Sequence, residues 1–311
     1  MKKAFVLLLA GLALSCAPKK DYTVKQESVE KTIKFLSDDA LKGRLAGSEG
    51  LQTAAQYLAD NFKKNGVKPY FTTYFDTLSN YKETTYNVIG YLEGTDPELK
   101  KEFVVFGAHY DHIGVADKPV DGDSIYNGAN DDASGCTAVY ELVNYFAKTK
   151  SNKRSILFCY FSAEEAGLLG SRHLAPKLKE KGFNIYAMLN FEMVGVPMKS
   201  ESMQAYVTGW GMSNMGDKIN EYAGKTFVGN LPAEGQYQLF RRSDNYSFYQ
   251  EFNVPSQTIC TFDFTNFDYY HHVKDEFANM DVVHMTAFIQ QVLPVVNKMV
   301  NTPTKEIVLK K

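Results

Sequence analysis

The stretch "SILFCYFSAEEAGLLG", residues Ser155–Gly170, sets two adjacent glutamates directly after an apolar run. The run Ser155–Phe161 is short, uncharged and almost wholly apolar, which is typical of a strand buried on both faces of a sheet. The segment Ala166–Lys181 that follows is long enough for a helix. Glu164 and Glu165 therefore fall where a strand passes into a helix, and two like charges at such a junction are costly unless something binds them.

The two glutamates allow a structural and a functional interpretation. Ser162 at the N-cap with Glu165 at the third helical position would form a capping box, but this explains only Glu165. In the functional interpretation one carboxylate binds a metal ion while its neighbour reaches a water molecule on that metal, because successive helical residues diverge by about 100°. The helix N-terminus would then help to keep both Glu164 and Glu165 ionised.

Helix-like and strand-like segments alternate outward from this junction. Helices are predicted at Asp21–Ala40, Ser48–Asn65, Ser134–Lys148, Ser243–Glu251 and Met280–Val300. Further strands are predicted at Tyr86–Leu92, Phe103–Ala108, Ile185–Glu192 and Ser256–Phe262. This alternation predicts a single α/β domain whose mixed, mostly parallel central sheet is covered by helices on both faces.

Two stretches depart from the regular alternation. Ala116–Asn130 is polar and contains glycine, so it is predicted to be a loop. Between about residues 196 and 240 the pattern weakens, which predicts an insertion or lid beside the site. Within that insertion, a short strand is predicted at Gln204–Thr208 and a helix at Asn214–Ala223.

Composition and the first residues indicate an exported globular protein. The chain has 311 residues, of which 44% are hydrophobic, and a net charge of −2, which suits a large packed core and argues against a nucleic-acid partner. The basic start Met1–Lys3 and the apolar run Ala4–Leu14 resemble a bacterial lipoprotein signal (residues 1–16), with residues 17–311 as the mature domain. Such a protein would be periplasmic or on the cell surface, anchored only by lipid on Cys16; a plain secretory signal is the alternative.

Cysteines are not expected to supply a metal site in this chain. Cys136, Cys159 and Cys260 remain after the signal, and because their number is odd at least one is unpaired. Cys159 and Cys260 lie in strand-like runs and fit as small core residues. No CxxC pair is present in the sequence, so any metal must be held by other side chains.

Four further stretches rich in metal-ligand residues follow or flank predicted strands. They are "GAHYDHIG" (Gly107–Gly114), "GANDDASG" (Gly128–Gly135), "LNFEMVG" (Leu189–Gly195) and "YYHHVKDEF" (Tyr269–Phe277). Open α/β sheets bind ligands outside the carboxyl ends of their strands, so these stretches are predicted to meet Glu164 and Glu165 in one crevice. Their mixture of imidazole and carboxylate groups suits zinc, which lowers the pKa of bound water to about 7.

Each stretch alone has a simpler explanation. His109 could be an ordinary residue at the end of a strand, although Asp111 on the same strand face could orient its imidazole. Asp131 and Asp132 could merely open a helix whose first turn favours acids, although a carboxylate can also bridge two metals. Two histidines, three carboxylates and a spare carboxylate together favour a metal site over these separate explanations.

In this order the motifs resemble the zinc aminopeptidases of the bacterial leucyl aminopeptidase type. That group also includes aminopeptidase Y and, more distantly, glutamate carboxypeptidase II and glutaminyl cyclase. The resemblance runs from "LKGRLAGSEG" (Leu41–Gly50) to "YYHHVKDEF" and so covers nearly the whole mature chain. It implies the co-catalytic zinc peptidase fold, two zinc ions and peptide substrates.

The resemblance also implies which side chains bind the two ions. His109 and Glu192 would hold one zinc, and Glu165 and His271 would hold the other. Asp131 would bridge the two ions, with a cis peptide bond to the aspartate that follows it.

Other residues receive supporting roles from the same resemblance. Glu164 would be the general base that takes a proton from water, and Asp111 would support the first histidine ligand. The second histidine ligand is assigned from the family pattern, in which an aspartate, here Asp275, follows four residues later. His112 and His272 are then expected to lie outside the direct ligands or on the surface.

The chain departs from the family pattern at several positions. Glu192 stands where many aminopeptidases carry aspartate, and Asn245 in "SDNYSF" replaces a histidine. Phe240 stands where some members use a tyrosine near the substrate carbonyl, so another donor or zinc alone would stabilise the oxyanion. Arg241 and Arg242 would either bind a substrate carboxylate or be surface residues.

We expect a metallo-aminopeptidase that cleaves peptides near a free N-terminus. A glutaminyl cyclase with one zinc and a carboxypeptidase for acidic substrates are the alternatives within the resemblance. A receptor-like ectodomain without catalysis is the alternative from another class, but such proteins have lost metal ligands and this chain retains the whole set.

Overall fold

The computed structural model describes residues 21–200 and 202–310. The predicted signal, including Cys16, lies outside the described residues and stays a prediction. Within the described ranges, every helix is too short or too polar to cross a bilayer.

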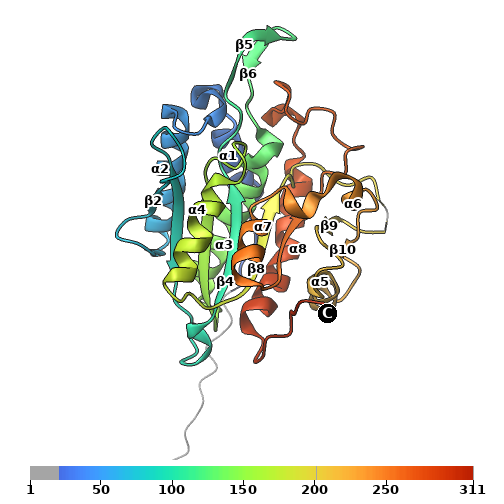
Figure 1. Cartoon of the computed structure of the whole chain (residues 1–311). Helices are drawn as coiled ribbons and strands as arrows, with labels where there is room; N and C mark the ends of the chain where they lie inside the picture. Colours follow the sequence, from blue (N-terminus) through green and yellow to red (C-terminus); the bar gives the residue numbers. More distant parts are fainter. Residues whose placement is uncertain (1–20, 201, 311) are drawn as a thin grey trace, which may run out of the picture.

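The described strands build one nine-stranded sheet and a separate two-stranded hairpin (Figure 1). The order in the large sheet is β1-β3-β7-β4-β8-β11-β9-β10, with β2 paired to β3. The four central strands β7, β4, β8 and β11 run parallel, and their neighbours β3 and β9 run antiparallel to them. The predicted α/β domain with a mixed sheet is confirmed. The strand bounds are β1 Lys68–Pro69, β2 Phe75–Thr77, β3 Tyr86–Leu92, β4 Phe103–His109, β5 Val115–Val120, β6 Asp123–Ile125, β7 Ser155–Phe161, β8 Ile185–Glu192, β9 Ala205–Val207, β10 Val228–Gly229 and β11 Ser256–Cys260.

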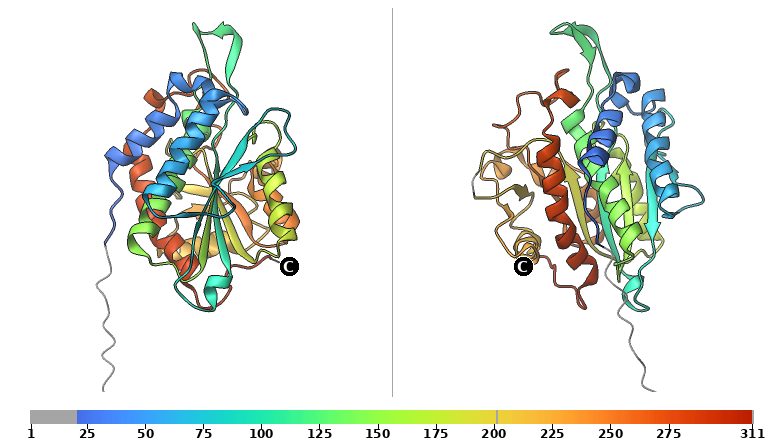
Figure 2. Two further views of the ribbon diagram at one scale, coloured as in Figure 1. Left: turned by 90° about the vertical axis from the view of Figure 1, so that its left-hand side faces the viewer. Right: turned by 180° about the vertical axis from the view of Figure 1, so that it is seen from behind.

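Helices cover both faces of the large sheet (Figure 2). Helices α1, α2, α3, α5 and α8 pack against one face, while α4 and α7 pack against the other. Strand β7 shows why, because all its residues are buried and alternate residues belong to opposite cores: Phe158 faces α2 and α3, and Leu157 faces α4. The helix bounds are α1 Gln26–Leu36, α2 Glu49–Lys64, α3 Gly135–Thr149, α4 Leu169–Glu180, α5 Met215–Ala223, α6 Glu234–Tyr237, α7 Asn245–Phe252 and α8 Val282–Asn301.

Helix α2 illustrates how local sequence and packing agree. The hydroxyl of Ser48 accepts a hydrogen bond from the backbone N–H of Leu51, which caps the helix start as predicted. Leu58 and Phe62 are fully buried, each contributing roughly 1.5–3 kcal/mol of hydrophobic free energy. Phe62 lies directly on Gly90 of β3, where a Cβ atom would come within 2.8 Å of the ring, so glycine is needed for this contact.

Three segments differ from the sequence-based expectation. Residues 116–130, predicted to be a loop, contain most of the β5–β6 hairpin, which projects beyond the body at the carboxyl end of the central strands (Figure 1). Helix α4 begins at Leu169 instead of Ala166, because residues 162–168 form a turn. The segment 196–240 adds β9 and β10 to the sheet edge, while its role as a lid stays a prediction.

Candidate metal centre

The two adjacent glutamates lie on a turn between β7 and α4, which rules out the alternative interpretation of Glu165 as part of a capping box. The residue before α4 is Leu168, and the Ser162 hydroxyl is instead 2.6 Å from the hydroxyl of Thr85. The backbone N–H groups of Glu164 and Glu165 donate to a carboxylate at 3.1 and 3.4 Å, which is that of Asp111. A carboxylate from the end of β4, and not the end of a helix, therefore fixes these two residues.

Asp131 is presented by a loop that a second carboxylate holds in place. Asp275 accepts hydrogen bonds from the backbone N–H of Asn130 at 2.7 Å and of Asp131 at 3.0 Å. The peptide bond between Asp131 and Asp132 is cis, as the family resemblance implies. Asp132 turns the other way, and its carboxylate accepts hydrogen bonds from backbone N–H groups at the start of α3 and the end of β8.

The carboxylate of Asp131 touches two imidazoles through different oxygen atoms. Its Oδ1 is 3.1 Å from Nε2 of His109, and its Oδ2 is 3.2 Å from Nε2 of His271. His109 ends strand β4, whereas His271 lies in the loop before α8. Folding thus joins groups that are more than 150 residues apart in sequence.

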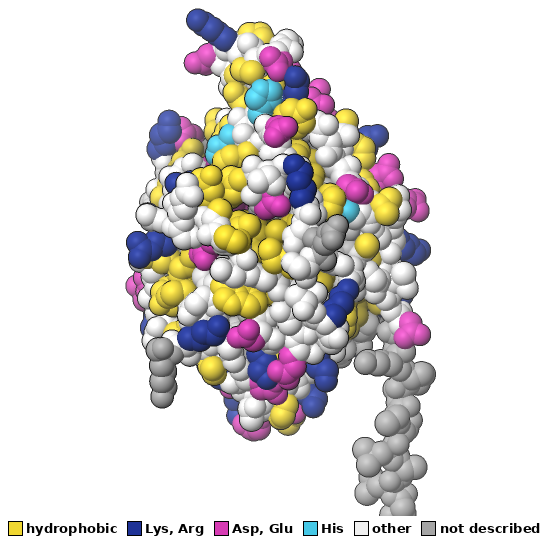
Figure 3. Space-filling view, turned by 90° about the vertical axis from the view of Figure 1, so that its right-hand side faces the viewer, with side chains coloured by type: hydrophobic (Ala, Val, Ile, Leu, Met, Phe, Trp, Pro, Cys, Tyr) yellow, Lys and Arg dark blue, Asp and Glu magenta, His cyan; other side chains and the backbone are white. Residues whose placement is uncertain are grey.

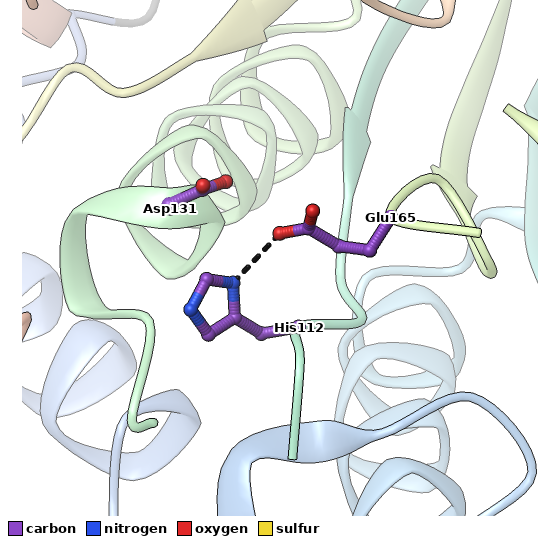
Figure 4. A group of neighbouring side chains, drawn as sticks. All are labelled: His112, Asp131 and Glu165. Carbon is purple, nitrogen blue, oxygen red and sulfur yellow. Dashed lines mark hydrogen bonds and ion pairs between the residues drawn. The ribbon is translucent and has the colours of Figure 1, made fainter. Parts of the chain in front are cut away.

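Glu165 completes this group from the far side. Its Oε2 is 3.1 Å from Nε2 of His271, and its Oε1 is 2.9 Å from Nδ1 of His112 (Figure 4). Single donor atoms of His112, Asp131 and Glu165 all lie within 4.8 Å of one another. His112 is fully buried and so is not a surface residue, which corrects one part of its predicted placement. His271 contacts carboxylate oxygens of both Asp131 and Glu165. His271 therefore fits the predicted role of a metal ligand beside Asp131 better than His112 does.

Glu164 and Glu192 are placed by burial more than by hydrogen bonds. Glu192 ends strand β8, and its Oε2 atom is buried without a hydrogen-bond partner among the described residues. The Nδ1 of His109 is 3.2 Å from the backbone oxygen of Asp111 and 3.8 Å from its carboxylate, so the backbone oxygen is the nearer partner. The predicted orienting role of the Asp111 carboxylate therefore stays a prediction.

Burial raises the pKa of several carboxyl groups around the cluster. It raises the pKa of Asp111 and of Glu192 to about 7 and that of Asp275 to about 8, with nearby carboxylates adding to the effect. Burial also raises the pKa of Glu164 well above its usual range, and Glu192 and Asp244 reinforce the shift. The cluster therefore holds more carboxyl groups than the neighbouring positively charged side chains can balance.

The pKa values of the two carboxylates in direct contact with imidazoles, Asp131 and Glu165, shift downward instead. Although burial opposes it, hydrogen bonds from His109 and His271 lower the pKa of Asp131. Hydrogen bonds from His112 and His271 lower that of Glu165 despite burial. Burial lowers the pKa of His271, but its hydrogen bonds to the two carboxylates outweigh burial and raise the pKa to about 10.

Some of the residues with strained backbone angles lie around the same cluster. Arg44, Ala163, Met193 and His271 have φ angles of 44°, 56°, 48° and 53°, in the left-handed region that disfavours side chains. Each lies next to a segment that carries a cluster residue. Such strain persists only where surrounding structure enforces it, and it is common at functional sites.

The donor set fits a pair of metal ions such as zinc. It combines imidazole nitrogens with carboxylate oxygens, which is the ligand chemistry that zinc accepts. The buried, unpartnered Oε2 atom of Glu192 and the Asp131 carboxylate, whose two oxygens contact different imidazoles, are features that a cation would satisfy. The structure brings together His109, Asp131, Glu165 and His271 by contact, with Glu192 half-buried at the end of β8.

Sequence reasoning missed the residue that ties the cluster segments together. Arg44 is fully buried and donates hydrogen bonds to the backbone carbonyls of Tyr110 at 2.8 Å, Asn127 at 2.6 Å, Gly128 at 2.9 Å and Leu36. One guanidinium therefore joins the segment after β4 to the loop that leads to Asp131. The only sequence signal was its place in "LKGRLAGSEG", which carries no information about its partners.

The departures from the family pattern have structural explanations. The Asn245 amide donates to the carbonyls of Phe240 and Ser256 inside the fold, so it serves packing. Arg241 is exposed and lies over the ring of Tyr246. Arg242 is also exposed, but it lines a cavity that reaches Glu192.

Two cavities border the cluster. A cavity of about 60 Å³ lies against Glu192, with Met193, Tyr206, Phe262 and Tyr270 among its lining residues. A larger hollow of about 250 Å³ has a lining that includes Asp111, His112 and Glu165. The two cavities share no lining residue, so the cluster borders two separate spaces.

A family model and several known proteins are similar to this chain over most of its length. A family model described as Peptidase family M28 matches residues 87–296. A probable leucine aminopeptidase of Trichophyton verrucosum is 30% identical over 227 residues, which cover 70% of this chain and 57% of that protein. The chain thus spans just over half the length of the first curated relatives it matches.

Solved structures share the fold along almost the whole chain. A zinc aminopeptidase from Bacillus subtilis has a TM-score of 0.70 at 18% identity, covering 92% of this chain and 98% of its own. A Bacteroides thetaiotaomicron glutaminyl cyclase has a TM-score of 0.66 at 20% identity, covering 89% of this chain and 98% of its own. At these identities the likeness shows the fold alone and does not separate the two activities.

Proposed function

The chain belongs to peptidase family M28, and from this membership we propose that it is a zinc-dependent aminopeptidase that removes N-terminal residues from peptides. The observation that carries the proposal is the Asp131 carboxylate, whose two oxygens each touch a different imidazole. A carboxylate held in this way is suited to bridge two cations. The names of the curated relatives, probable leucine aminopeptidases and probable zinc metalloproteases, support the same activity.

We assign the ligands as the resemblance implies. His109 and Glu192 would hold one zinc ion, Glu165 and His271 would hold the other, and Asp131 would contact both. Zinc bound there would polarise the scissile carbonyl and lower the pKa of water.

The protein's own groups would handle the proton and the substrate. Glu164 accepts the proton of the attacking water and delivers it to the leaving amine. Asp111 holds the backbone of Glu164 and Glu165 through its two carboxylate oxygens, and so sets where the base lies. The Tyr270 ring stacks on His271 with 4.1 Å between ring centroids and lines the narrow cavity, so its side chain borders the substrate.

A panel of reporter substrates tests this function. Aminoacyl reporters with a free amine should be hydrolysed, N-acetylated versions should not, and a metal chelator should abolish the reaction. Cyclisation of peptides that begin with glutamine would favour a cyclase. Cleavage that requires a free C-terminal carboxylate would favour a carboxypeptidase. A folded protein that binds no zinc and cleaves none of these substrates would favour a receptor-like role.

Export and lipid anchoring form a separate part of the proposal. The basic start and apolar run before Cys16 support it. A Cys16→Ser variant expressed from the full gene should leave the membrane fraction, whereas wild-type protein should remain in it. Equal fractionation of the two proteins would reject the anchor without affecting the proposed activity.

A further inference from the structure

We propose that the hollow beside Glu165 binds an apolar side chain of the residue that follows the scissile bond. We name it the leaving-side pocket; its lining residues are Leu45, Ala46, Tyr81, Asp111, His112, Ile113, Glu165 and Ala166. The inference deepens the proposed aminopeptidase function and rests on it. It predicts preference at the second residue of the substrate, in addition to any preference at the first.

The leaving-side pocket opens directly onto the metal cluster. Asp111, His112 and Glu165 belong both to its wall and to the cluster described above. An occupant of the pocket therefore lies within one residue of the bond that reacts.

The two cavities differ in a way that sets the direction of the substrate. The cavity beside Glu192 is narrow, at about 60 Å³, and suits a single side chain at the end of a chain. The leaving-side pocket is wider, at about 250 Å³, and more open to solvent, so it can admit a residue whose chain continues. A peptide cut after its first residue needs this arrangement, with the enclosed cavity on the amine side.

The chemistry of the lining favours an apolar side chain. Leu45, Ala46, Tyr81 and Ile113 supply the part of the wall away from the cluster. Leu45 is held in place by a β-bridge that pairs it with His112 and by its contact with Gly114, yet it remains 48% exposed.

Two exposed apolar side chains border the metal cluster. Among the large hydrophobic residues described as exposed, Leu45 lines the leaving-side pocket and Tyr270 lines the cavity beside Glu192. Figure 3 views the molecule from the side of α5, α6 and β10, where hydrophobic side chains lie beside histidines below the projecting hairpin. Single exposed apolar residues are ordinary, but a group at a binding site indicates a ligand that covers it.

A charged substrate side chain would find no free partner in the leaving-side pocket. The Glu165 carboxylate already contacts His112 and His271, and the Asp111 carboxylate accepts two backbone hydrogen bonds. These acids are therefore not free to pair with a basic side chain, and they repel an acidic one.

Tripeptides that share one first residue and vary only the second test this proposal. We expect kcat/KM to be about 10-fold or more higher for leucine or phenylalanine at the second position than for glycine, since one apolar side chain in a fitting pocket gives discrimination of that order. Lysine and aspartate at that position should not exceed glycine.

A matched pair of variants assigns the effect to the pocket. Leu45→Ser should reduce the leucine-to-glycine ratio to about a third or less of the wild-type ratio, while preference at the first residue stays unchanged. Val308→Ser is the control, because Val308 is also 48% exposed but lies near the C-terminus, where its backbone pairs with Asn214. It should leave both preferences at wild-type values.

Two results would overturn the proposal while leaving the aminopeptidase function intact. One is equal kcat/KM for leucine and glycine at the second position in the wild-type protein. The other is a change in first-residue preference, instead of second-residue preference, in Leu45→Ser. Failure to cleave any peptide of the set would instead reject the proposed function itself, and the pocket proposal with it.

Discussion

Two fully buried arginines lie at opposite ends of the central sheet and are satisfied in different ways. Arg154, just before β7, donates to the carboxylate of Glu102 at 2.8 Å and to the carbonyl of Thr302 at 2.5 Å, and its guanidinium lies 4.5 Å from the ring centroid of Tyr186. Arg44, at the carboxyl end, donates only to backbone carbonyls and has no described carboxylate within ion-pair distance.

The two ends of the sheet differ in how their buried charges are balanced. At the amino end, the buried guanidinium of Arg154 is paired with the carboxylate of Glu102. At the carboxyl end one guanidinium is accompanied by a surplus of carboxyl groups. Asp111, Asp131, Asp132, Asp244 and Asp275 are buried, and Glu164 and Glu192 are half-buried. Buried charges without partners are strongly destabilising. This end of the sheet therefore needs bound cations that the other end does not.

The largest expected effect separates activity from stability. Glu164→Gln should lower kcat/KM with an aminoacyl substrate by about 10²–10⁴-fold, the usual contribution of a general base. Because burial already raises the pKa of Glu164, the neutral amide should leave the melting temperature equal or higher. Glu102→Gln at the amino end should do the reverse, losing about 1–3 kcal/mol of stability and keeping activity.

Steady-state kinetics and thermal unfolding of both variants check this pair. Near-full turnover in Glu164→Gln would show that the assigned base is wrong. A loss of turnover in Glu102→Gln equal to that in Glu164→Gln would show that the two ends are not functionally distinct.

The second expected effect is a pH dependence of the metal-free protein. Burial raises the pKa of Asp111 and Glu192 to about 7 and of Asp275 to about 8, so the folded protein binds protons that the unfolded chain releases above about pH 4. Stability should therefore fall as pH rises from about 5 to 8, by at least about 2 kcal/mol at about 1.4 kcal/mol per pKa unit. His271, with its pKa raised to about 10, adds to the fall above about pH 6.5.

Denaturant unfolding of chelator-treated protein at pH 5 and pH 8 measures this trend. The lowered pKa values of Asp131 and Glu165 act in the opposite sense, but their contribution is complete above about pH 5 and does not change in this window. The zinc-loaded protein should show the opposite slope, because metal ligands bind in deprotonated form. A flat or rising stability in the metal-free protein would contradict the proposed surplus of buried acids.

The fold was largely predictable because its signals are local. The strands β3, β7 and β8 have the predicted bounds, since short apolar runs between polar segments define them. Helix α2 was also placed within a residue, because Ser48 is a local cap. The β5–β6 hairpin was missed, because its strands are exposed and lack an apolar pattern.

The site was predictable only as a set of residue types near strand ends. His109 and Glu192 end strands, as expected from the rule for open sheets. The turn at Glu164 was mistaken for a helix start, because its partner, the Asp111 carboxylate, is more than 50 residues away in sequence. Arg44 could not be found for the same reason, since its partners are backbone carbonyls from three other segments.

The third expected effect is smaller and concerns zinc affinity and melting temperature in variants of the two buried arginines. Arg44→Lys keeps the charge but cannot reproduce the fork of donors, so it should weaken zinc affinity by about 10-fold, as the loss of outer contacts to a metal site commonly does. Arg154→Lys should lower the melting temperature without changing zinc affinity. Competition with a chromogenic chelator, together with melting curves with and without zinc, measures both. An equal change in affinity for the two variants would mean that Arg44 acts only on stability.

The smallest effect concerns the surface near the site. Lys274 and Asp121 form an exposed ion pair at 2.7 Å between the hairpin and the loop that carries His271. Solvent screens such pairs, so Asp121→Asn should leave the melting temperature and kcat/KM unchanged within error. A clear loss of turnover would show that the hairpin, and not only the buried carboxyl end, positions the site.

Zinc titration of the metal-free protein, followed by calorimetry and aminoacyl-substrate turnover in the same samples, tests the two-metal site most directly. We predict that the stripped protein is inactive, that it binds two zinc ions per chain, and that Asp131→Asn weakens the binding of both. Full turnover without metal, or saturation at one zinc ion with full activity, would contradict the account.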